Sequence, residues 1–260
     1  MIRIEKIDVY GWEAAIRGMR NPMNSWDKSD SGKAVDCGKC GKIEREGICN
    51  GENRDCTGFE IYHIGENDMD LMQRLFKAGS EHRKYLRFVT VTMDITAPFY
   101  WWKEFKTYRK GRQFLDDGDE ILDPEEMEMF VETNSCSTMH KIYAKEFTVD
   151  DFSFEKCVDD VLALNHINDV LWILNRCREQ YLETKEKKLW YMMVQLLPSS
   201  YNQKRTVQIN YEVAVRMIQQ RKNHKLDEWR EFVGVLLELP HMKEIMRVQG
   251  EWYGEIDKME

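Results

Sequence analysis

The alternation of hydrophobic and polar positions predicts two strands in the first hundred residues. Residues 2–10 alternate regularly, and residues 88–95 combine alternation with many β-branched side chains, as a half-buried strand should. Between them, residues 12–19 and 68–79 carry hydrophobic side chains at helical spacing, and a glycine ends the second of these segments. We therefore expect strand and helix to alternate here.

The rest of the chain has mainly helical periodicity. Residues 99–110 are expected to form a helix with Pro98 at its first position, because the N–H that proline lacks would be unpaired there anyway. Residues 154–187 keep a helical period over many turns, which predicts a packed core helix. Three shorter helices are predicted at residues 189–197, 207–220 and 226–237.

These elements predict an α+β fold, a single domain over residues 1–260, with two insertions. Residues 34–58 contain four cysteines near the N-terminus. Residues 112–132 are acidic, with eight Asp or Glu between positions 116 and 128 and no basic residue among them. The acidic insertion is interpreted as a solvated flap, or as a site for a cation or a basic partner. Its second part resembles a helix that starts at Asp123.

Composition excludes several classes of protein. The formal net charge of -8 argues against a general nucleic-acid binder, which needs clustered basic residues. No window approaches the length of about 18 apolar residues that a membrane span requires. The first residues lack the apolar core of a secretory signal, and Cys136, Cys157 and Cys177 are too scattered for a disulfide framework. We expect a cytoplasmic protein with reduced thiols.

The four cysteines of the first insertion have the spacing C-x2-C-x8-C-x6-C. They are Cys37, Cys40, Cys49 and Cys56. Four thiolates suit a structural zinc ion, which would leave no open coordination position for chemistry. The second pair is too widely separated for a standard zinc ribbon, so an iron–sulfur cluster and unligated thiols remain alternatives.

Residues 134–140 gather small hydroxyl, thiol and imidazole groups with almost no apolar bulk. They are interpreted as a ligand-binding turn or as a capped helix start. A third interpretation is a Cys136 nucleophile with His140 as its base, since a thiolate needs a nearby imidazolium or helix N-terminus.

Basic residues collect near the C-terminus of this otherwise acidic chain. They are Lys204, Arg205, Arg216, Arg221, His224 and Arg230. Such a cluster suits an anion, because the arginine fork matches phosphate bidentately. The alternative interpretation is a set of exposed helix charges.

Residues 97–102 resemble the start of the signature of flavin-dependent thymidylate synthases, in which Ala-Pro leads from a strand into an aromatic helix. Arg109 then stands on the last arginine of the family's Arg-His-Arg. Ser137 stands on the signature serine if the acidic stretch is an insertion. Asn134 and Ser137 fit the family's Asn-Glu-x-Ser, although Ser135 replaces the glutamate.

The C-terminal half resembles the same family more closely. Asn210 and Arg221 keep the family's spacing of eleven residues, and His224 and Arg230 follow in the family's order. Glu212 replaces an arginine of that series. The resemblance covers residues 80–235 and leaves the four cysteines outside.

The resemblance implies an α+β fold with a central, mostly antiparallel sheet flanked by long helices. It also implies a homotetramer. The implied reaction uses FAD, NADPH and methylenetetrahydrofolate to methylate dUMP or a related pyrimidine nucleotide at C5. It assigns catalysis to Ser137, Arg109 and Arg230. It assigns the flavin to Arg109, Asn134, Asn210, Arg221 and His224. It assigns the nucleotide to Ser135, Ser137, His140 and Arg230. Alternatives are flavin-dependent alkylation of a different pyrimidine nucleotide, and a non-catalytic nucleotide-binding homologue with a zinc module.

Overall fold

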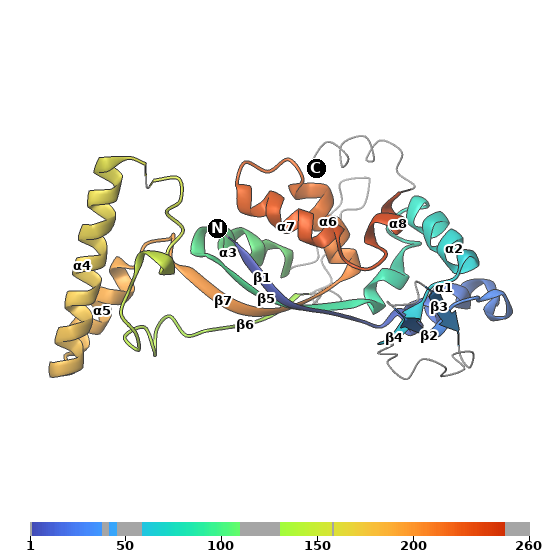
Figure 1. Cartoon of the computed structure of the whole chain (residues 1–260), viewed down its shortest axis with the longest axis horizontal. Helices are drawn as coiled ribbons and strands as arrows, with labels where there is room; N and C mark the ends of the chain where they lie inside the picture. Colours follow the sequence, from blue (N-terminus) through green and yellow to red (C-terminus); the bar gives the residue numbers. More distant parts are fainter. Residues whose placement is uncertain (1, 38–41, 46–58, 110–130, 158, 248–260) are drawn as a thin grey trace, which may run out of the picture. The chain divides into compact units, whose positions relative to one another are not determined.

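The computed structural model of the chain describes residues 2–37, 42–45, 59–109, 131–157 and 159–247. It has the α+β architecture with a mostly antiparallel sheet that the sequence predicts (Figure 1). The strand order in the four-stranded sheet is β1 (Arg3–Tyr10), β5 (Thr90–Pro98), β7 (Asn202–Asn210) and β6 (Val131–Ser135). Among the described residues, none of the helices combines the length and the hydropathy that a membrane span needs.

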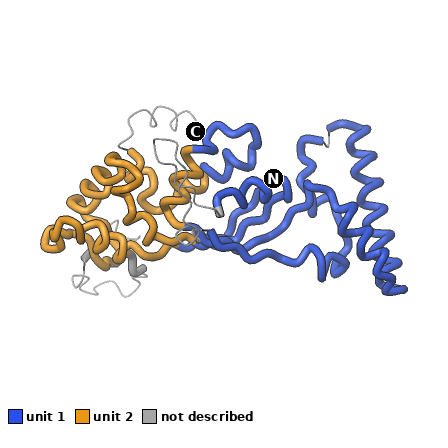
Figure 2. Tube along the Cα trace, turned by 180° about the vertical axis from the view of Figure 1, so that it is seen from behind, with its two compact units in different colours: residues 1–8, 92–209, 220–233 blue, residues 9–91, 210–219, 234–260 orange. Residues whose placement is uncertain are grey.

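The chain divides into two compact units, which Figure 2 shows in blue and orange. Unit 1 comprises residues 1–8, 92–209 and 220–233, and unit 2 comprises residues 9–91, 210–219 and 234–260. The prediction of a single domain over residues 1–260 stays a prediction.

In unit 1, strand β5 runs directly into α3 (Phe99–Phe105), which continues as the 3-10 segment η4 (Lys106–Arg109). Pro98 lies at the N-cap with extended backbone, one position before the one that the sequence predicts. The helical conformation therefore spans nearly the predicted residues, but its last turn is tighter than an α-helix.

Strand β7 corrects the helix predicted at residues 207–220. Residues up to Asn210 are extended, and helix α6 (Tyr211–Arg221) begins immediately afterwards. Val207 and Ile209 are buried while Thr206 and Gln208 are exposed, which is the period of two that a strand requires. Strand β6, which we did not predict, pairs antiparallel with β7 from Val131 opposite Ile209 to Ser135 opposite Arg205.

A pair of long helices forms the second half of unit 1. Helices α4 (Val161–Thr184) and α5 (Lys187–Leu196) lie side by side (Figure 1). Helix α4 starts later than the predicted residue 154, because Asp160 caps it by accepting a hydrogen bond from the Ala163 N–H at 2.8 Å. The two helices bury Leu174 and Met193 against an apolar core that includes Phe147 and Phe152.

Unit 2 combines helices with a separate three-stranded antiparallel sheet. Its helices are α1 (Trp12–Arg20), α2 (Glu66–Lys77), most of α6 and α8 (Met242–Met246), and helix α7 (Asp227–Leu237) begins in unit 1 and ends here. The strand order in the sheet is β3 (Lys42–Arg45), β2 (Gly32–Cys37) and β4 (Phe59–His63). Gly11 precedes α1 at φ 98°, where a Cβ atom would lie 2.0 Å from the Phe88 carbonyl oxygen, so this position requires glycine.

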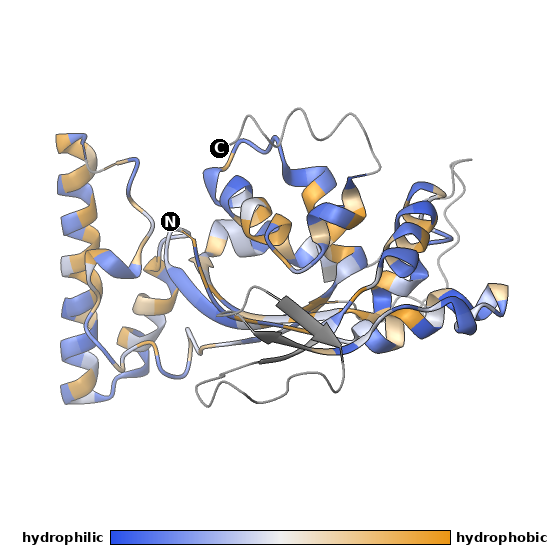
Figure 3. Cartoon of the chain, turned by 45° about the vertical axis from the view of Figure 1, so that its right-hand side comes forward, coloured by the Kyte–Doolittle hydropathy of each residue, from blue (hydrophilic) through white to orange (hydrophobic). Residues whose placement is uncertain are grey.

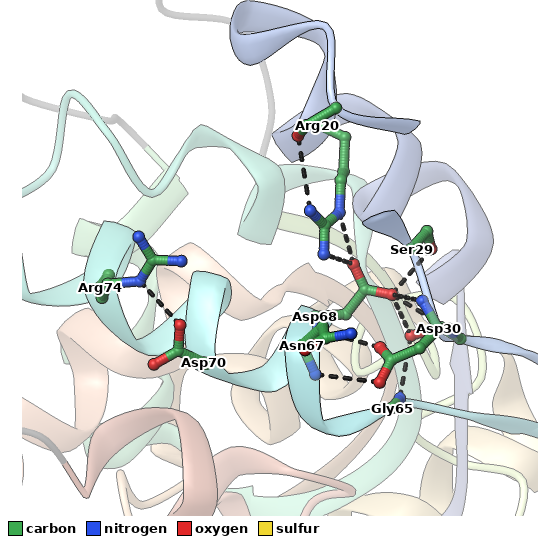
Figure 4. Close-up of polar contacts among 10 residues, drawn as sticks. Arg20, Ser29, Asp30, Gly65, Asn67, Asp68, Asp70 and Arg74 are labelled. Atoms are coloured by element: carbon green, nitrogen blue, oxygen red, sulfur yellow. Dashed lines mark hydrogen bonds and ion pairs between the residues drawn. The ribbon is translucent and has the colours of Figure 1, made fainter. Parts of the chain in front are cut away.

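Asp68, at the start of α2, organises the loop that follows α1 (Figure 4). Its fully buried carboxylate accepts a hydrogen bond from Arg20 Nε at 2.7 Å and from the hydroxyls of Ser29 and Ser31 at 2.7 and 2.6 Å. Asp30 in turn accepts hydrogen bonds from the backbone N–H groups of Asn67 and Asp68 in the first turn of α2. Burial alone would raise the pKa of Asp68, but these hydrogen bonds and the Arg20 charge outweigh it and lower the pKa below its usual value of 3.8.

We predict that Asp68→Asn lowers the free energy of unfolding by about 3 kcal/mol, because it leaves the Arg20 charge buried without its counter-charge. Urea denaturation measures this change. The matched control is Asp70→Asn, which breaks the solvent-exposed ion pair with Arg74 on the same helix and should cost about 0.5 kcal/mol or less.

The same carboxylate predicts an acid dependence. Since the folded-state pKa of Asp68 is lowered, its contribution to stability is present above its unfolded pKa near 3.8 and is lost as the pH falls through the lower folded value. The stability difference between the native chain and Asp68→Asn should therefore shrink below about pH 4. A difference that stays constant down to acid unfolding would contradict this account.

Candidate functional site

Glu104 on α3 contacts three side chains of unit 1, two of which are the predicted flavin residues Arg221 and His224. Its Oε2 atom accepts a hydrogen bond from Trp229 Nε1 at 2.7 Å. The same oxygen lies 3.3 Å from His224 Nε2 and 3.6 Å from Arg221 Nη1. The sequence analysis predicted Arg221 and His224 but did not include Glu104 or Trp229, so the structure adds an acceptor and a donor to the candidate site.

Aromatic rings surround the guanidinium of Arg221. Its central carbon lies 4.8 Å from the centroid of the Trp229 ring and 5.5 Å from that of Tyr108. Arg221 Nε also donates a hydrogen bond to the Tyr108 hydroxyl at 2.8 Å. Tyr108 stands where the family's Arg-His-Arg has its histidine, whereas Arg221 keeps the family's spacing. A residue that departs from the family pattern therefore contacts one that keeps it.

Trp101 on α3 is the centre of the packing beneath this group. Its ring is fully buried and lies 4.8 Å from Trp229, 5.0 Å from Phe105 and 5.4 Å from Phe232, measured between centroids. Aromatic pairs at such distances contribute beyond the area that they bury. The aromatic run of the family-like signature is therefore mostly core, and it fixes α7 against α3.

A second polar contact fixes the start of α7. The Tyr100 hydroxyl donates a short hydrogen bond to the buried carboxylate of Glu228. Burial raises the pKa of Tyr100, and the neighbouring Glu228 carboxylate raises it further. At the surface, Lys156 and Arg230 both pair with Asp227, and Arg230 Nη1 donates to the His224 carbonyl at 2.7 Å. Arg230 thus contacts the backbone of His224, whose imidazole lies with Arg221 beside Glu104.

The segment 134–140 lies on the surface, where it continues the edge strand β6. Asn134, Ser135, Ser137 and His140 are all exposed. The Ser137 hydroxyl accepts a hydrogen bond from the His140 N–H at 2.9 Å, so the two residues form a hydroxyl-capped turn. Among the described residues no contact between the Cys136 thiol and the His140 imidazole is present, and the ligand-binding turn stays a prediction.

Gln203 and Trp102 connect this turn to the aromatic core. Gln203 Nε2 donates to the Cys136 carbonyl at 2.9 Å, and Trp102 Nε1 donates to the Gln203 carbonyl at 2.9 Å. The guanidinium of Arg205 lies 4.2 Å above the Trp102 ring and its Nε bonds Gln203 at 3.0 Å. The predicted basic cluster is therefore two separate sets of contacts. Arg205 is buried against Trp102 and Gln203, whereas Arg221 contacts Glu104 and Arg230 contacts the His224 carbonyl.

The remaining predicted flavin residue, Asn210, belongs to unit 2. It is buried at the end of β7, where its Oδ1 accepts a hydrogen bond from the Val213 N–H at 2.9 Å and starts α6. Glu212, which replaces a family arginine, forms a buried ion pair with Arg83, with Oε2 and Nε 2.9 Å apart. Burial raises the pKa of Glu212, and Arg83 opposes that rise. Arg83 thus neutralises the carboxylate that stands at position 212 in place of the family arginine.

Several predicted positions lie outside the described residues. These are Cys40, Cys49 and Cys56, together with most of the acidic insertion at residues 112–132. Cys37 ends strand β2 and Arg109 ends η4, but their side chains are not among those described. Within the described part of the chain, no group of three or more His, Cys, Asp or Glu side chains is arranged to hold a metal ion.

A sequence signal for two of the missed residues existed. Glu104 and Tyr108 are four residues apart, as are Trp101 and Phe105, so helical spacing places each pair on one face. We interpreted the whole run as aromatic and basic and did not separate its buried face from its polar one. Trp229 gave no such signal, because only packing shows that its indole N–H reaches Glu104.

Among the solved structures that share this fold are two crystal structures of enzymes from one organism. One is thymidylate synthase X (ThyX) from Helicobacter pylori with FAD and dUMP, at 14% sequence identity and a TM-score of 0.58, with 95% of this chain and 99% of that chain covered. The other is flavin-dependent thymidylate synthase ThyX from Helicobacter pylori complexed with FAD and dUMP, at 14% identity and a TM-score of 0.54, covering 93% and 98%. No family model and no curated protein matches the sequence. At this identity the likeness shows the fold, and it confirms the structural side of the resemblance.

Proposed function

We propose, from the fold that the chain shares with ThyX, that it is a flavin-dependent enzyme that methylates a pyrimidine nucleotide, dUMP or a relative of it, at C5. The observation that supports this proposal is the grouping of Arg221, His224 and Arg230 within that fold. These are the residues that the resemblance assigns to the flavin and the nucleotide. A site made of arginines, an imidazole and aromatic rings orients ligands and stabilises charge, while a cofactor supplies the chemistry.

The residues present fit an aromatic, anionic cofactor such as FAD. Arg221 keeps about a fifth of its side chain exposed, 20%, although rings flank its guanidinium. A partly exposed, pre-oriented guanidinium can bond a phosphate or an electron-rich ring edge without a large ordering cost. Bound FAD would carry reducing equivalents. Arg221, His224 and Asn134 of unit 1 would hold and orient it.

The proposed nucleotide site uses the exposed turn after β6 together with Arg230. Ser135, Ser137 and His140 offer hydroxyl and imidazole groups at the surface, and Arg230 offers a guanidinium for the phosphate. Arg109, which the resemblance also assigns to catalysis, would complete the proposed site. NADPH as the source of electrons and methylenetetrahydrofolate as the source of the carbon complete the proposal, in which the folate donates a methylene that is reduced to the methyl group.

We predict that the purified chain binds FAD and that Arg221→Ala weakens this binding about 10- to 100-fold, since a hydrogen bond to a charged group contributes about 1.5 to 3 kcal/mol. Quenching of flavin fluorescence during titration measures the dissociation constant. The matched control is Lys225→Ala, which removes an exposed positive charge from the same turn and should leave the affinity unchanged.

Product mass separates the alternatives for the reaction. Deoxyuridine nucleotide and deoxycytidine nucleotide are each supplied with NADPH and methylenetetrahydrofolate, and the mass of the product is measured. The nucleotide that the chain accepts as its substrate should gain one methyl group. Methylation of deoxycytidine nucleotide alone would favour the different pyrimidine. A chain that binds nucleotide but takes up no FAD and methylates neither would contradict the enzyme and favour the non-catalytic homologue.

We also propose that the chain is a homotetramer and that α4 contributes to one of its contacts. Leu162 and Trp172 on α4 are 80% and 68% exposed, which is unusual for large apolar side chains in a monomer. Hydrophobic residues recur along the whole of α4 in Figure 3. Leu162 and Ile173 are eleven residues apart, so they share one face of the helix.

The charges on this face favour a second copy of the chain as the partner. A two-fold axis between Leu162 and Ile173 would pair each with the other across two antiparallel helices. The same axis would place His166 opposite Asp169, so an imidazole meets a carboxylate across the contact. Isologous contacts of this kind are the commonest among homo-oligomers.

We predict that Leu162→Asp lowers the oligomeric state of the chain, because it places a charge in an apolar contact. Light scattering coupled to size-exclusion chromatography measures the mass in solution. Leu182→Asp is the control, since Leu182 lies on α4 about 200° around the helix axis from Leu162. A native chain that is monomeric, or a Leu162→Asp chain that keeps the native mass, would contradict this contact.

The four-cysteine segment supports a separate proposal, a structural zinc ion bound by Cys37, Cys40, Cys49 and Cys56. Its support is the spacing of the thiols alone. We predict about one zinc per chain by elemental analysis and a loss of that zinc in Cys37→Ser, whereas Cys136→Ser, at an exposed thiol outside the segment, should retain it. Iron with sulfide would instead indicate a cluster, and metal-free protein would indicate unligated thiols.

A further inference from the structure

Glu104 is a carboxylate inside a group of anion-binding side chains. Its Oε2 atom accepts from Trp229 Nε1 at 2.7 Å and lies 3.3 Å from His224 Nε2 and 3.6 Å from Arg221 Nη1. Three donors that would suit the oxygen of a phosphate thus already face one carboxylate oxygen of the chain itself.

The carboxylate is held in place by the aromatic core. Trp229 is fully buried, and its indole N–H has Glu104 as its partner. If Glu104 turned away into solvent, that buried N–H would lose its hydrogen bond, which is costly. Glu104 is therefore a fixed negative charge and not a side chain that swings aside when a ligand arrives.

A fixed negative charge changes which ligands Arg221 can bind. The Glu104 side chain is 38% exposed and that of Arg221 is 20% exposed, so water screens the pair only in part. An anion that bonds Arg221 comes close to the Glu104 carboxylate and is repelled by it. A ligand that also directs a ring N–H or an amino group toward Glu104 gains a hydrogen bond that compensates for the repulsion.

We propose that Glu104 is a specificity-determining residue, whose carboxylate excludes small, highly charged anions from the Arg221 and His224 group and admits ligands that combine an anionic group with a hydrogen-bond donor. The identity of that ligand as a flavin or a nucleotide rests on the proposed function. The exclusion of simple anions does not, because it follows from the contacts of Glu104 alone.

The test uses inorganic pyrophosphate as the probe and isothermal titration calorimetry on the full-length chain. Glu104→Gln keeps the size of the side chain and removes its charge, and it should bind pyrophosphate about tenfold more tightly than the native chain, a factor equal to ~1.4 kcal/mol. The matched control is Glu231→Gln, which removes the charge of an exposed carboxylate on α7 and should change the affinity little. Adding Arg221→Ala to Glu104→Gln should abolish the gain.

Equal or weaker binding by folded Glu104→Gln would overturn the proposal, and so would an equal gain in Glu231→Gln, which would be an effect of net charge. If Glu104→Gln does not fold, Glu104→Asp withdraws the carboxylate by one methylene from Arg221 and should bind pyrophosphate a few-fold more tightly. An unchanged affinity in Glu104→Asp would then count against the proposal. Because no flavin is used, a chain that fails to bind FAD can still pass this test. A chain that binds FAD can equally fail it.

Discussion

The packing of Trp101 against Trp229 is the contact on which the candidate site depends. It brings α7 onto α3 with both rings fully buried. The indole N–H of Trp229 donates to Glu104, and the guanidinium carbon of Arg221 lies 4.8 Å from the centroid of the same ring system. A hydrophobic contact thus determines where the polar groups meet. The geometry of the site is therefore a property of the core and not of the surface turns around it.

Periodicity predicted the elements whose burial is one-sided. Strand β5 and helices α1, α2 and α7 appear close to the predicted residues. Strand β1 also appears there although most of its side chains are exposed, and α4, predicted as a packed core helix from residue 154, begins at Val161 and is mostly exposed. The prediction failed at β7, because one of its buried positions is occupied by a charged residue, Arg205, and a helix follows without a break. Strand β6 gave no signal, since only its pairing with β7 makes Asn134 and Ser135 extended. Pairing partners distant in sequence are what a single sequence conceals.

For the site, residue identity was easier to predict than residue partnership. The family spacing indicates Arg221, His224 and Arg230. In the structure Arg221 and His224 lie beside Glu104, and Arg230 bonds the His224 carbonyl. The sequence could not show that Glu212 is compatible with the fold, because that depends on Arg83, which lies 129 positions away. It also could not assign Arg205 to the buried side of the turn, since alternation places it there only once β7 is known to be a strand.

The direct junction between β7 and α6 limits how the chain can change its length in evolution. Asn210 ends the strand, and Tyr211 begins the helix, with no loop between them. Each residue inserted there would rotate everything later in α6 by about 100° around the helix axis, and would carry Arg221 away from its present direction. The number of residues at this junction therefore sets the side of the α6 axis on which Arg221 lies.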